Sequence, residues 1–450
     1  MMSPARALVW LACLPVCALA QQSPEQKEIE ALKAAVAAAQ SAGDNAWMLV
    51  SAALVLMMTG PGLALFYAGL VRRKNVLGTL MQSFAMMPII TVLWAVCGYS
   101  LCFAEGNAIL GGFDYLFLRG VGAAPNADYA PTIPHQTFML YQMMFAIISP
   151  ALITGAFAER VRFRALVVFS ILWCFLVYFP LAHMIWGKGG FFNATLGGKV
   201  AVFDFAGGIV VHVNAGTAAL VTALVVGPRR GFPHTAMPPH SLPLTVLGAG
   251  MLWVGWFGFN AGSALAANGN AGMAMLVTHT GAATGALAWM VMEWLRYGKP
   301  SMLGIVTGMV AGLGTITPAS GFVGPMGAVV IGGVAGVVCF AATQFLKRVL
   351  HIDDSLDVSP VHGVGGVIGT LMTGIFVSAS FGGAGYAEGM TMAKQIGVQA
   401  LGVLATAAWC GALTFAILKL LDATAGLRVD AEAETEGLDL ADHGERGYTP

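Results

Sequence analysis

Long apolar stretches of the sequence contain or adjoin four ionisable side chains that are candidates for function: Asp204, His212, His279 and His362. An ionisable residue in a membrane-spanning segment costs about 2.5–3.5 kcal/mol on insertion scales, and such residues commonly line the path of an ion, a proton or a solute. Each of the four is therefore a candidate functional residue. The alternative for each histidine is a structural role, with its ring nitrogens hydrogen-bonded inside the protein.

Two of the histidines share a pattern. Asp204 precedes His212 by eight residues in DFAGGIVVH, and Asp354 precedes His362 by eight residues in DSLDVSPVH. Two imidazoles at one depth can share a hydrogen bond, in which one ring donates and the other accepts, and each can still turn a ring edge toward a solute. This pairing favours a functional role for His212 and His362. His279 has no such counterpart and stays unassigned.

Aromatic residues form the second chemical signal. In GWFGFNAGS at 255–263, Phe259 and Ser263 lie four residues apart and so share one helical face. Phe145 lies within a neighbouring apolar stretch, and Trp186 lies at the end of another. Aromatic faces and one hydroxyl oxygen can hold a cation that has lost its hydration shell. A single aromatic residue is weak evidence, because such residues are common in cores and at membrane interfaces.

Other chemistries find little support. The seven cysteines have no C-x-x-C spacing, so we expect buried core residues and no metal site. No nucleophile–base constellation indicates an enzyme, and no cofactor is expected. The 22 basic and 22 acidic residues give a net charge of zero, which gives no indication of a nucleic-acid partner.

The elements that must position these residues are transmembrane helices. Over 450 residues the hydrophobic fraction is 57% and the charged fraction is 10%, so the chain needs a lipid bilayer as its solvent. Apolar runs long enough to cross a bilayer predict an all-α integral membrane protein with eleven spans. The eighth span is short and ends at Pro318, which favours a place inside the bundle. The predicted spans are 47–70, 79–103, 137–158, 165–186, 206–227, 243–266, 272–294, 301–318, 323–346, 358–379 and 392–421.

The distribution of lysine and arginine predicts the orientation. With the N-terminus outside, fifteen basic residues fall in the inner loops and tail, and four fall outside after residue 45. Cytoplasmic loops retain positive charge, so we expect the C-terminus inside. Residues 1–20 resemble a signal peptide, with Arg6, an apolar run and a small-x-small site at Ala18-Leu19-Ala20. Residues 21–45 would form an extracytoplasmic helix or a loose arm.

The two Asp-to-His segments also predict an inverted repeat. Each opens a span rich in glycine and valine, one starting outside and the other inside. Spans one to five and six to ten would be the two repeats, with the solute pathway between them and span eleven outside the repeat.

From about Asp44 onward the sequence resembles the Amt branch of the Amt/Mep/Rh superfamily of ammonium transporters. Several long motifs occur in order on the predicted spans. They are GPGLALFYAGLVRRKN at 60–75, GAFAERVRF at 155–163, AHMIWGKGG at 182–190, DFAGGIVVHVNAG at 204–216, GWFGFNAGS at 255–263, TPASGFVG at 317–324 and DDSLDVSPVHGVGGVIG at 353–369.

The resemblance implies an outer recruitment site for ammonium and a gate below it. Phe145, Trp186 and Ser263 would form the recruitment site, with Tyr141 nearby, and Phe145 would stack on Phe259 as the gate. Trp186 and Ser263 favour the Amt branch over the Rh branch.

The resemblance also implies a pore and an assembly. His212 and His362 would line a dry pore as a hydrogen-bonded pair, and Asp204 would support the recruitment site without binding the ion. A histidine at 212 argues against the fungal variant. The implied fold is the eleven-helix Amt fold, assembled as a homotrimer with one pore in each subunit.

These expectations predict a transporter at residues 46–425, in the inner membrane of a bacterium. Ammonium would lose its proton at the outer site and cross the apolar pore as ammonia, while the proton takes a separate hydrated route. Residues 426–450 would be a soluble, partly disordered tail, or the family's cytosolic tail that packs under the neighbouring subunit and meets a PII signalling protein. The open alternatives are an ammonium sensor that signals through this tail and a channel for another small neutral gas.

Overall fold

The computed structural model describes residues 23–448, so the predicted signal peptide at 1–20 lies outside the described residues. The chain divides into two units, residues 1–42 and 43–450. In the first unit the described residues are helical from Pro24, and nearly all of their side chains are exposed. Ser23 and Gln26 cap this start through reciprocal hydrogen bonds of 3.1 and 3.0 Å. The N-terminal segment is therefore a helix and not a loose arm.

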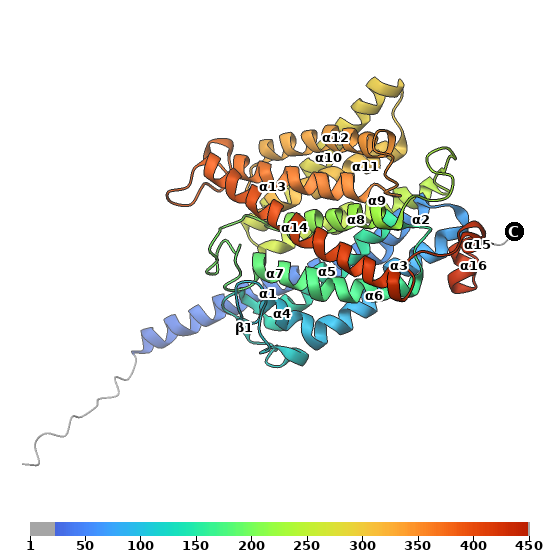
Figure 1. Cartoon of the computed structure of the whole chain (residues 1–450). Helices are drawn as coiled ribbons and strands as arrows, with labels where there is room; N and C mark the ends of the chain where they lie inside the picture. The colour runs from blue at the N-terminus through green and yellow to red at the C-terminus, as the bar shows by residue number, and fades with distance from the viewer. Residues whose placement is uncertain (1–22, 449–450) are drawn as a thin grey trace, which may run out of the picture. The chain divides into compact units, whose positions relative to one another are not determined.

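The described residues are predominantly helical (Figure 1). The α-helices are α1 (Pro24–Met57), α2 (Ala64–Leu70), α3 (Val76–Leu93), α4 (Tyr99–Phe103), α5 (His135–Ile153), α6 (Phe163–Trp173), α7 (Phe179–Trp186), α8 (Asn214–Val226), α9 (Leu242–Ala261), α10 (Gly269–Tyr297), α11 (Met302–Ile316), α12 (Pro325–Arg348), α13 (Gly365–Phe376), α14 (Met392–Thr424), α15 (Ala431–Glu436) and α16 (Leu438–His443).

Shorter elements join or interrupt these helices. The π-helical segments are η1 (Met58–Leu63), η3 (Trp94–Gly98), η6 (Cys174–Tyr178), η7 (Gly208–Val213) and η10 (Ser359–Val364). The 3₁₀ turns are η2 (Arg73–Asn75), η4 (Leu116–Leu118), η5 (Thr154–Phe157), η8 (Gly262–Ala264), η9 (Thr317–Ala319) and η11 (Ala379–Phe381). One antiparallel hairpin pairs β1 (Pro125–Asn126) with β2 (Ala130–Pro134).

Ten helical stretches within the described residues are long and apolar enough to cross a membrane. They correspond to ten of the eleven predicted spans, because a backbone in lipid must satisfy its own hydrogen bonds and so remains helical. The remaining span, predicted at 358–379, corresponds to η10 and α13. Ser359, Pro360 and His362 make its first turns less apolar than those of the other spans.

The eighth span packs inside the bundle, as its short length predicted. Of its 18 most apolar consecutive residues, 83% are buried, against 33% for the neighbouring span Gly269–Tyr297. Glycines make this packing possible. A side chain on Gly312 would collide with the Gly281 carbonyl group of α10, and one on Gly332 of α12 would meet the same carbonyl. The small residues of α12 thus bring helix backbones into close contact.

The two segments that carry the paired histidines cross each other. A side chain on Gly216 in α8 would collide with the backbone of Gly363 in η10. The crossing lies four residues beyond His212 and one residue beyond His362, so it brings the two rings into contact. Among the described cysteines, Cys102, Cys174, Cys339 and Cys410 are buried, as predicted, whereas Cys97 is only partly buried; Cys13 and Cys17 lie outside the described residues.

The described part of the C-terminal tail is ordered, in contrast to the first of the two alternatives, a partly disordered tail. It forms α15 and α16, which lie against the end of the bundle that also holds the Arg73–Asn75 turn (Figure 1). Asn75 accepts a hydrogen bond of 2.8 Å from the Leu438 backbone, and Asp439 accepts one of 2.8 Å from the Gly78 backbone. We call this end of the bundle the tail face and the end with the β1–β2 hairpin the opposite face.

Candidate functional site

Three cavities follow one another between the two faces. A cavity of about 320 Å³ opens on the opposite face, a narrow one of about 10 Å³ lies inside, and a second cavity of about 320 Å³ opens toward the tail face. Phe66, Val310 and His362 line both the narrow cavity and the tail-face cavity. Two phenyl rings in contact separate the narrow cavity from the opposite-face cavity. Together the cavities outline one pathway.

The opposite-face cavity is lined by Phe145, Trp186 and Ser263, three of the residues expected at the recruitment site. The Phe145 and Trp186 ring centroids are 5.7 Å apart and nearly perpendicular, at 83°. Trp186 donates its indole N–H to the Asp204 carbonyl oxygen at 3.0 Å, which fixes the ring. Ser263 donates to the Phe259 carbonyl oxygen at 2.9 Å, and a hydroxyl oxygen has two lone pairs, so it can still act as an acceptor.

Tyr141 lies behind this cavity and does not line it. Its side chain is fully buried, and its ring packs on Phe145 with a centroid distance of 5.1 Å. The Tyr141 hydroxyl lies 2.7 Å from the Phe259 carbonyl oxygen and 3.1 Å from the Ser263 hydroxyl oxygen. The structure thus places Tyr141 as a support for the residues that face the cavity.

Phe145 and Phe259 close the pathway below the opposite-face cavity. Their ring centroids are 4.4 Å apart, and each residue is 1% exposed. Phe145 comes from α5 and Phe259 from α9, so this contact joins two helices that are distant in the sequence. A hydrated ion cannot pass while the two rings are in contact, since the cost of removing its water is not repaid by apolar carbon.

The paired histidines meet in the narrow cavity. His212 in η7 and His362 in η10 have their Nδ1 atoms 3.1 Å apart and their ring planes within 12°. One Nδ1 must donate and the other accept, so the two rings hold different tautomers or share a proton. The Nε2 atom of His212 is buried and has no hydrogen-bond partner among the described residues. A buried polar atom without a partner indicates a place for a small polar solute or water.

Asp204 also lines the opposite-face cavity, and its carboxylate is hydrogen-bonded to the backbone. Its Oδ1 accepts hydrogen bonds from the Gly207 and Gly208 backbones at 2.9 and 2.6 Å, and its Oδ2 accepts from Ile209 and Val210 at 2.8 and 3.1 Å. The carboxylate therefore caps the segment that carries His212, and its negative charge suits the start of a helix.

Asp354 makes the equivalent cap in the second half. Its carboxylate accepts from the Val358 backbone at 3.1 Å, the Ser359 backbone at 2.6 Å and the Ser359 hydroxyl at 2.6 Å. The shared Asp-to-His spacing is thus a shared local structure in which an aspartate holds the first turn of a π-helical segment. The sequence alone marks Asp354 as part of the repeat but carries no signal that places it at the site.

Sequence reasoning also missed Trp256. This residue lines the narrow cavity and stacks on the His212 ring, with centroids 5.5 Å apart and planes within 17°. It lies three residues before Phe259, so the same helical face that identified Phe259 and Ser263 includes it. His279, in contrast, is an exposed residue that stacks on Trp253, and it lines none of the three cavities. Within residues 23–448, no three His, Cys, Asp or Glu side chains form a cluster able to hold a metal ion.

Three comparisons with known proteins all identify the same family. The family model of the Ammonium Transporter Family matches residues 46–448. The chain is 47% identical to an ammonium transporter of Bacillus subtilis over 408 residues, which cover 90% of this chain and 98% of the relative. It is 45% identical to the ammonium transporter Amt1 of Archaeoglobus fulgidus over 412 residues, or 91% of this chain and all of the relative.

Solved structures of members of this family have the same fold as this chain. A sensor Amt protein superposes with a TM-score of 0.82 at 30% identity, covering 90% of this chain and 99% of that chain. Mep2 of Saccharomyces cerevisiae superposes with a TM-score of 0.78 at 36% identity, covering 87% of this chain and 88% of that chain.

Proposed function

The chain belongs to the Ammonium Transporter Family, and on that premise we propose that it recruits ammonium at the opposite-face cavity and passes it as neutral ammonia through the His212–His362 pore. It is a multi-pass membrane protein and an ammonium transporter. The observation that carries the mechanism is the order of features along the pathway: an aromatic cavity, a phenyl pair in contact, a narrow apolar cavity with two histidines, and a second wide cavity toward the tail face.

Recruitment would use the aromatic faces of Phe145 and Trp186 together with the Ser263 oxygen. A cation over an aromatic ring gains about 0.5–2 kcal/mol, and the hydroxyl oxygen can accept one N–H. Asp204 would contribute indirectly. Its carboxylate accepts hydrogen bonds from backbone N–H groups, and its carbonyl oxygen orients Trp186.

Selectivity for ammonium over potassium would follow because only ammonium can lose its charge by giving up a proton. Ammonium and potassium ions are close in size, so a rigid cage alone discriminates poorly between them. Ammonium can give up a proton, and ammonia can then cross the narrow cavity of about 10 Å³ without the desolvation cost of an ion. The histidine pair would supply hydrogen-bond contacts to the solute, and the proton would take a separate hydrated route.

The direct test is flux in sealed vesicles that contain only this protein. We expect ammonium uptake well above that of protein-free vesicles, together with exclusion of potassium. A sensor Amt protein is among the structural neighbours, so the second candidate is an ammonium sensor. Saturable ammonium binding without flux would favour the sensor and would contradict the transporter.

We propose that the chain assembles as a homotrimer in a bacterial inner membrane, as its resemblance to the Amt branch implies. The tail face would lie in the cytosol, since that orientation places fifteen basic residues in the inner loops and tail and four in the outer loops after residue 45. The tail would meet a PII protein. Deleting residues 428–450 should then abolish binding of a PII protein to the purified transporter, and undiminished binding would argue against the tail as its site.

A further inference from the structure

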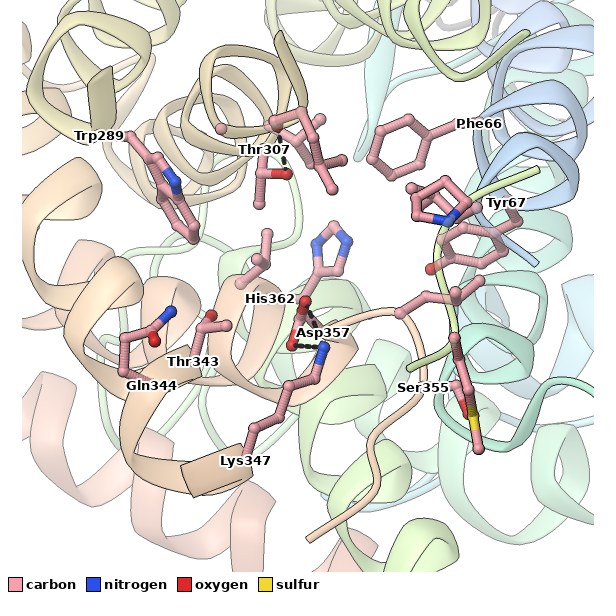
Figure 2. Close-up of a pocket in the computed structure, with 18 of the residues that line it drawn as sticks. Phe66, Tyr67, Trp289, Thr307, Thr343, Gln344, Lys347, Ser355, Asp357 and His362 are labelled. Atoms are coloured by element: carbon pink, nitrogen blue, oxygen red, sulfur yellow. Dashed lines mark hydrogen bonds and ion pairs between the residues drawn. The ribbon is translucent and has the colours of Figure 1, made fainter. Parts of the chain in front are cut away.

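Lys347 and Asp357 form an ion pair inside the tail-face cavity. Lys347 lies in the last turn of α12, and Asp357 lies in the turn before η10, five residues before His362. The Lys347 Nζ lies 2.7 Å from one Asp357 carboxylate oxygen and 2.8 Å from the other. Figure 2 shows the pair close to His362, and all three side chains line the cavity. The ion pair therefore lies where the narrow pathway widens.

The other charged groups of this cavity have partners elsewhere. Arg229 donates to Asp353 at 2.8–2.9 Å, and Glu293 accepts from the Ser301 backbone and hydroxyl at 2.7 and 3.0 Å. Arg348 lies 5.6 Å from the centre of the Tyr297 ring. Among the described residues, two carboxylates line this cavity. Glu293 is held by hydrogen bonds from Ser301, and Asp357 is paired with the flexible ammonium group of Lys347.

A second oxygen in this cavity lacks a partner. Thr343 is 6% exposed, and its hydroxyl oxygen has no hydrogen-bond partner among the described residues. Thr343 and Lys347 lie four residues apart on α12 and so share one helical face. Figure 2 shows Thr343 beside the same cavity as Asp357 and Lys347. A carboxylate and a neutral oxygen are together suited to bind a small cation that carries several N–H donors.

The ion pair is also open to competition. The Lys347 and Asp357 side chains are partly buried, at 30% and 22% exposed, and the Asp357 Oδ1 atom is itself buried. An ion pair that keeps part of its contact with solvent is weak. Burial of the carboxylate raises the pKa of Asp357 above its ordinary value; the charges of Lys347 and Arg229 oppose this rise only in part, and the nearby Asp354 adds to it. The carboxylate is therefore incompletely compensated and would gain from a better-placed cation.

We propose that Asp357 and Thr343 form a binding site for ammonium on the tail face, and that the Lys347 ammonium group occupies this site as a tethered competitor. The lysine head group carries the same charge and the same kind of N–H donors as the transported ion, so the two exclude each other. The proposal rests on the proposed function, because it concerns ammonium that reaches or leaves the pore at His362.

The test measures ammonium flux in sealed vesicles in which either the tail face or the opposite face receives the substrate. K347M removes the competing charge and keeps an unbranched side chain, so the KM measured from the tail face should fall by about 1.5- to 5-fold. D357N should raise that KM by a similar factor, and T343V should raise it more weakly. The KM measured from the opposite face should change in none of the three variants.

R348M is the matched control, because Arg348 lines the same cavity but lies over Tyr297. If R348M lowers the tail-face KM as much as K347M does, the general positive potential of the cavity is responsible and the site is wrong. An unchanged tail-face KM in K347M would also overturn the proposal, and that variant decides the matter even if D357N does not fold. Absence of ammonium flux in the wild-type protein would instead contradict the proposed function.

Discussion

At the scale of single residues, the central contact is the one between His212 and His362, whose Nδ1 atoms are 3.1 Å apart. Replacing either ring with alanine removes a polar contact from the pathway and leaves the other ring without its partner. Each lost hydrogen bond is worth about 1 kcal/mol, or about fivefold in rate, so ammonium flux should fall by at least that factor. Alternatively, the enlarged pore should leak potassium. Flux and potassium permeability in vesicles, normalised to folded protein, measure both effects.

His279→Ala is the matched control for the histidine pair. His279 is exposed and lines none of the three cavities, so its loss should leave ammonium flux and potassium exclusion unchanged. Well-folded His212→Ala and His362→Ala proteins with wild-type flux and undiminished exclusion of potassium would make the pair a structural element only.

Trp186 belongs to the same scale, since its ring is proposed to hold the incoming cation. Trp186→Leu removes a cation–π contact worth about 0.5–2 kcal/mol, which corresponds to a rise of about 2- to 30-fold in the KM measured from the opposite face. Trp186→Phe should restore part of the affinity. Concentration-dependent uptake measures the effect, and Trp253→Leu, which changes a ring that packs on His279, serves as the control. A wild-type KM in Trp186→Leu would exclude this ring from ammonium binding.

At the scale of elements, the aspartate caps decide where the π-helical segments begin. Asp204→Ala would leave four backbone N–H groups of η7 and the residues before it without their acceptor. Unpaired buried groups cost about 1–3 kcal/mol each when water cannot reach them, so we expect a lower unfolding temperature and a displaced His212. Asp204→Asn keeps one acceptor oxygen, so its unfolding temperature should lie between those of the alanine variant and the wild type. Thermal unfolding in detergent orders the three proteins, and an alanine variant as stable as wild type would contradict the capping role.

At the scale of the whole molecule, a buried charge network joins loops from both halves of the chain on the tail face. Glu159 pairs with Arg72 at 2.7 Å and with Arg229 at 3.4 Å, and Asp353 pairs with Arg229 at 2.8 Å and with Arg160 at 3.5 Å. The Glu159 side chain is completely buried. Removing one member of such a network leaves the others uncompensated, so Glu159→Gln should cost about 3–5 kcal/mol of stability.

The network also predicts a dependence of stability on pH. Burial opposes ionisation of Glu159 and Asp353, but the hydrogen bonds and charges of Arg72 and Arg229 outweigh it and hold the pKa of each carboxyl group below its ordinary value. Stability from these groups is therefore complete above their ordinary pKa values of 4.5 and 3.8 and is lost as the pH falls through the lower folded values. Unfolding temperatures from pH 7 to pH 3 should fall more steeply for the wild type than for Glu159→Gln. Parallel curves would contradict this account.

Much of the molecule follows from the sequence by local rules. Apolar runs must be helical in lipid, so the ten helices that meet the criteria for a span, together with η10 and α13, lie where the eleven spans were predicted. The spacing of two residues on one helix is equally local, and it was enough to associate Phe259 with Ser263 and each histidine with its upstream aspartate. The long motifs identified the family, which the family model and the relatives confirm.

Contacts between helices were decided only by the tertiary structure. Periodicity tells which face of a helix a residue shares, but it does not tell which ring from another helix that face will meet. The Phe145–Phe259 and His212–His362 contacts join residues more than a hundred positions apart, and packing alone sets their distances. The same reason explains why Tyr141 lies behind the cavity, why Lys347 reaches Asp357, and why the tail is ordered: its partners lie in the turn at Arg73–Asn75, at the other end of the chain.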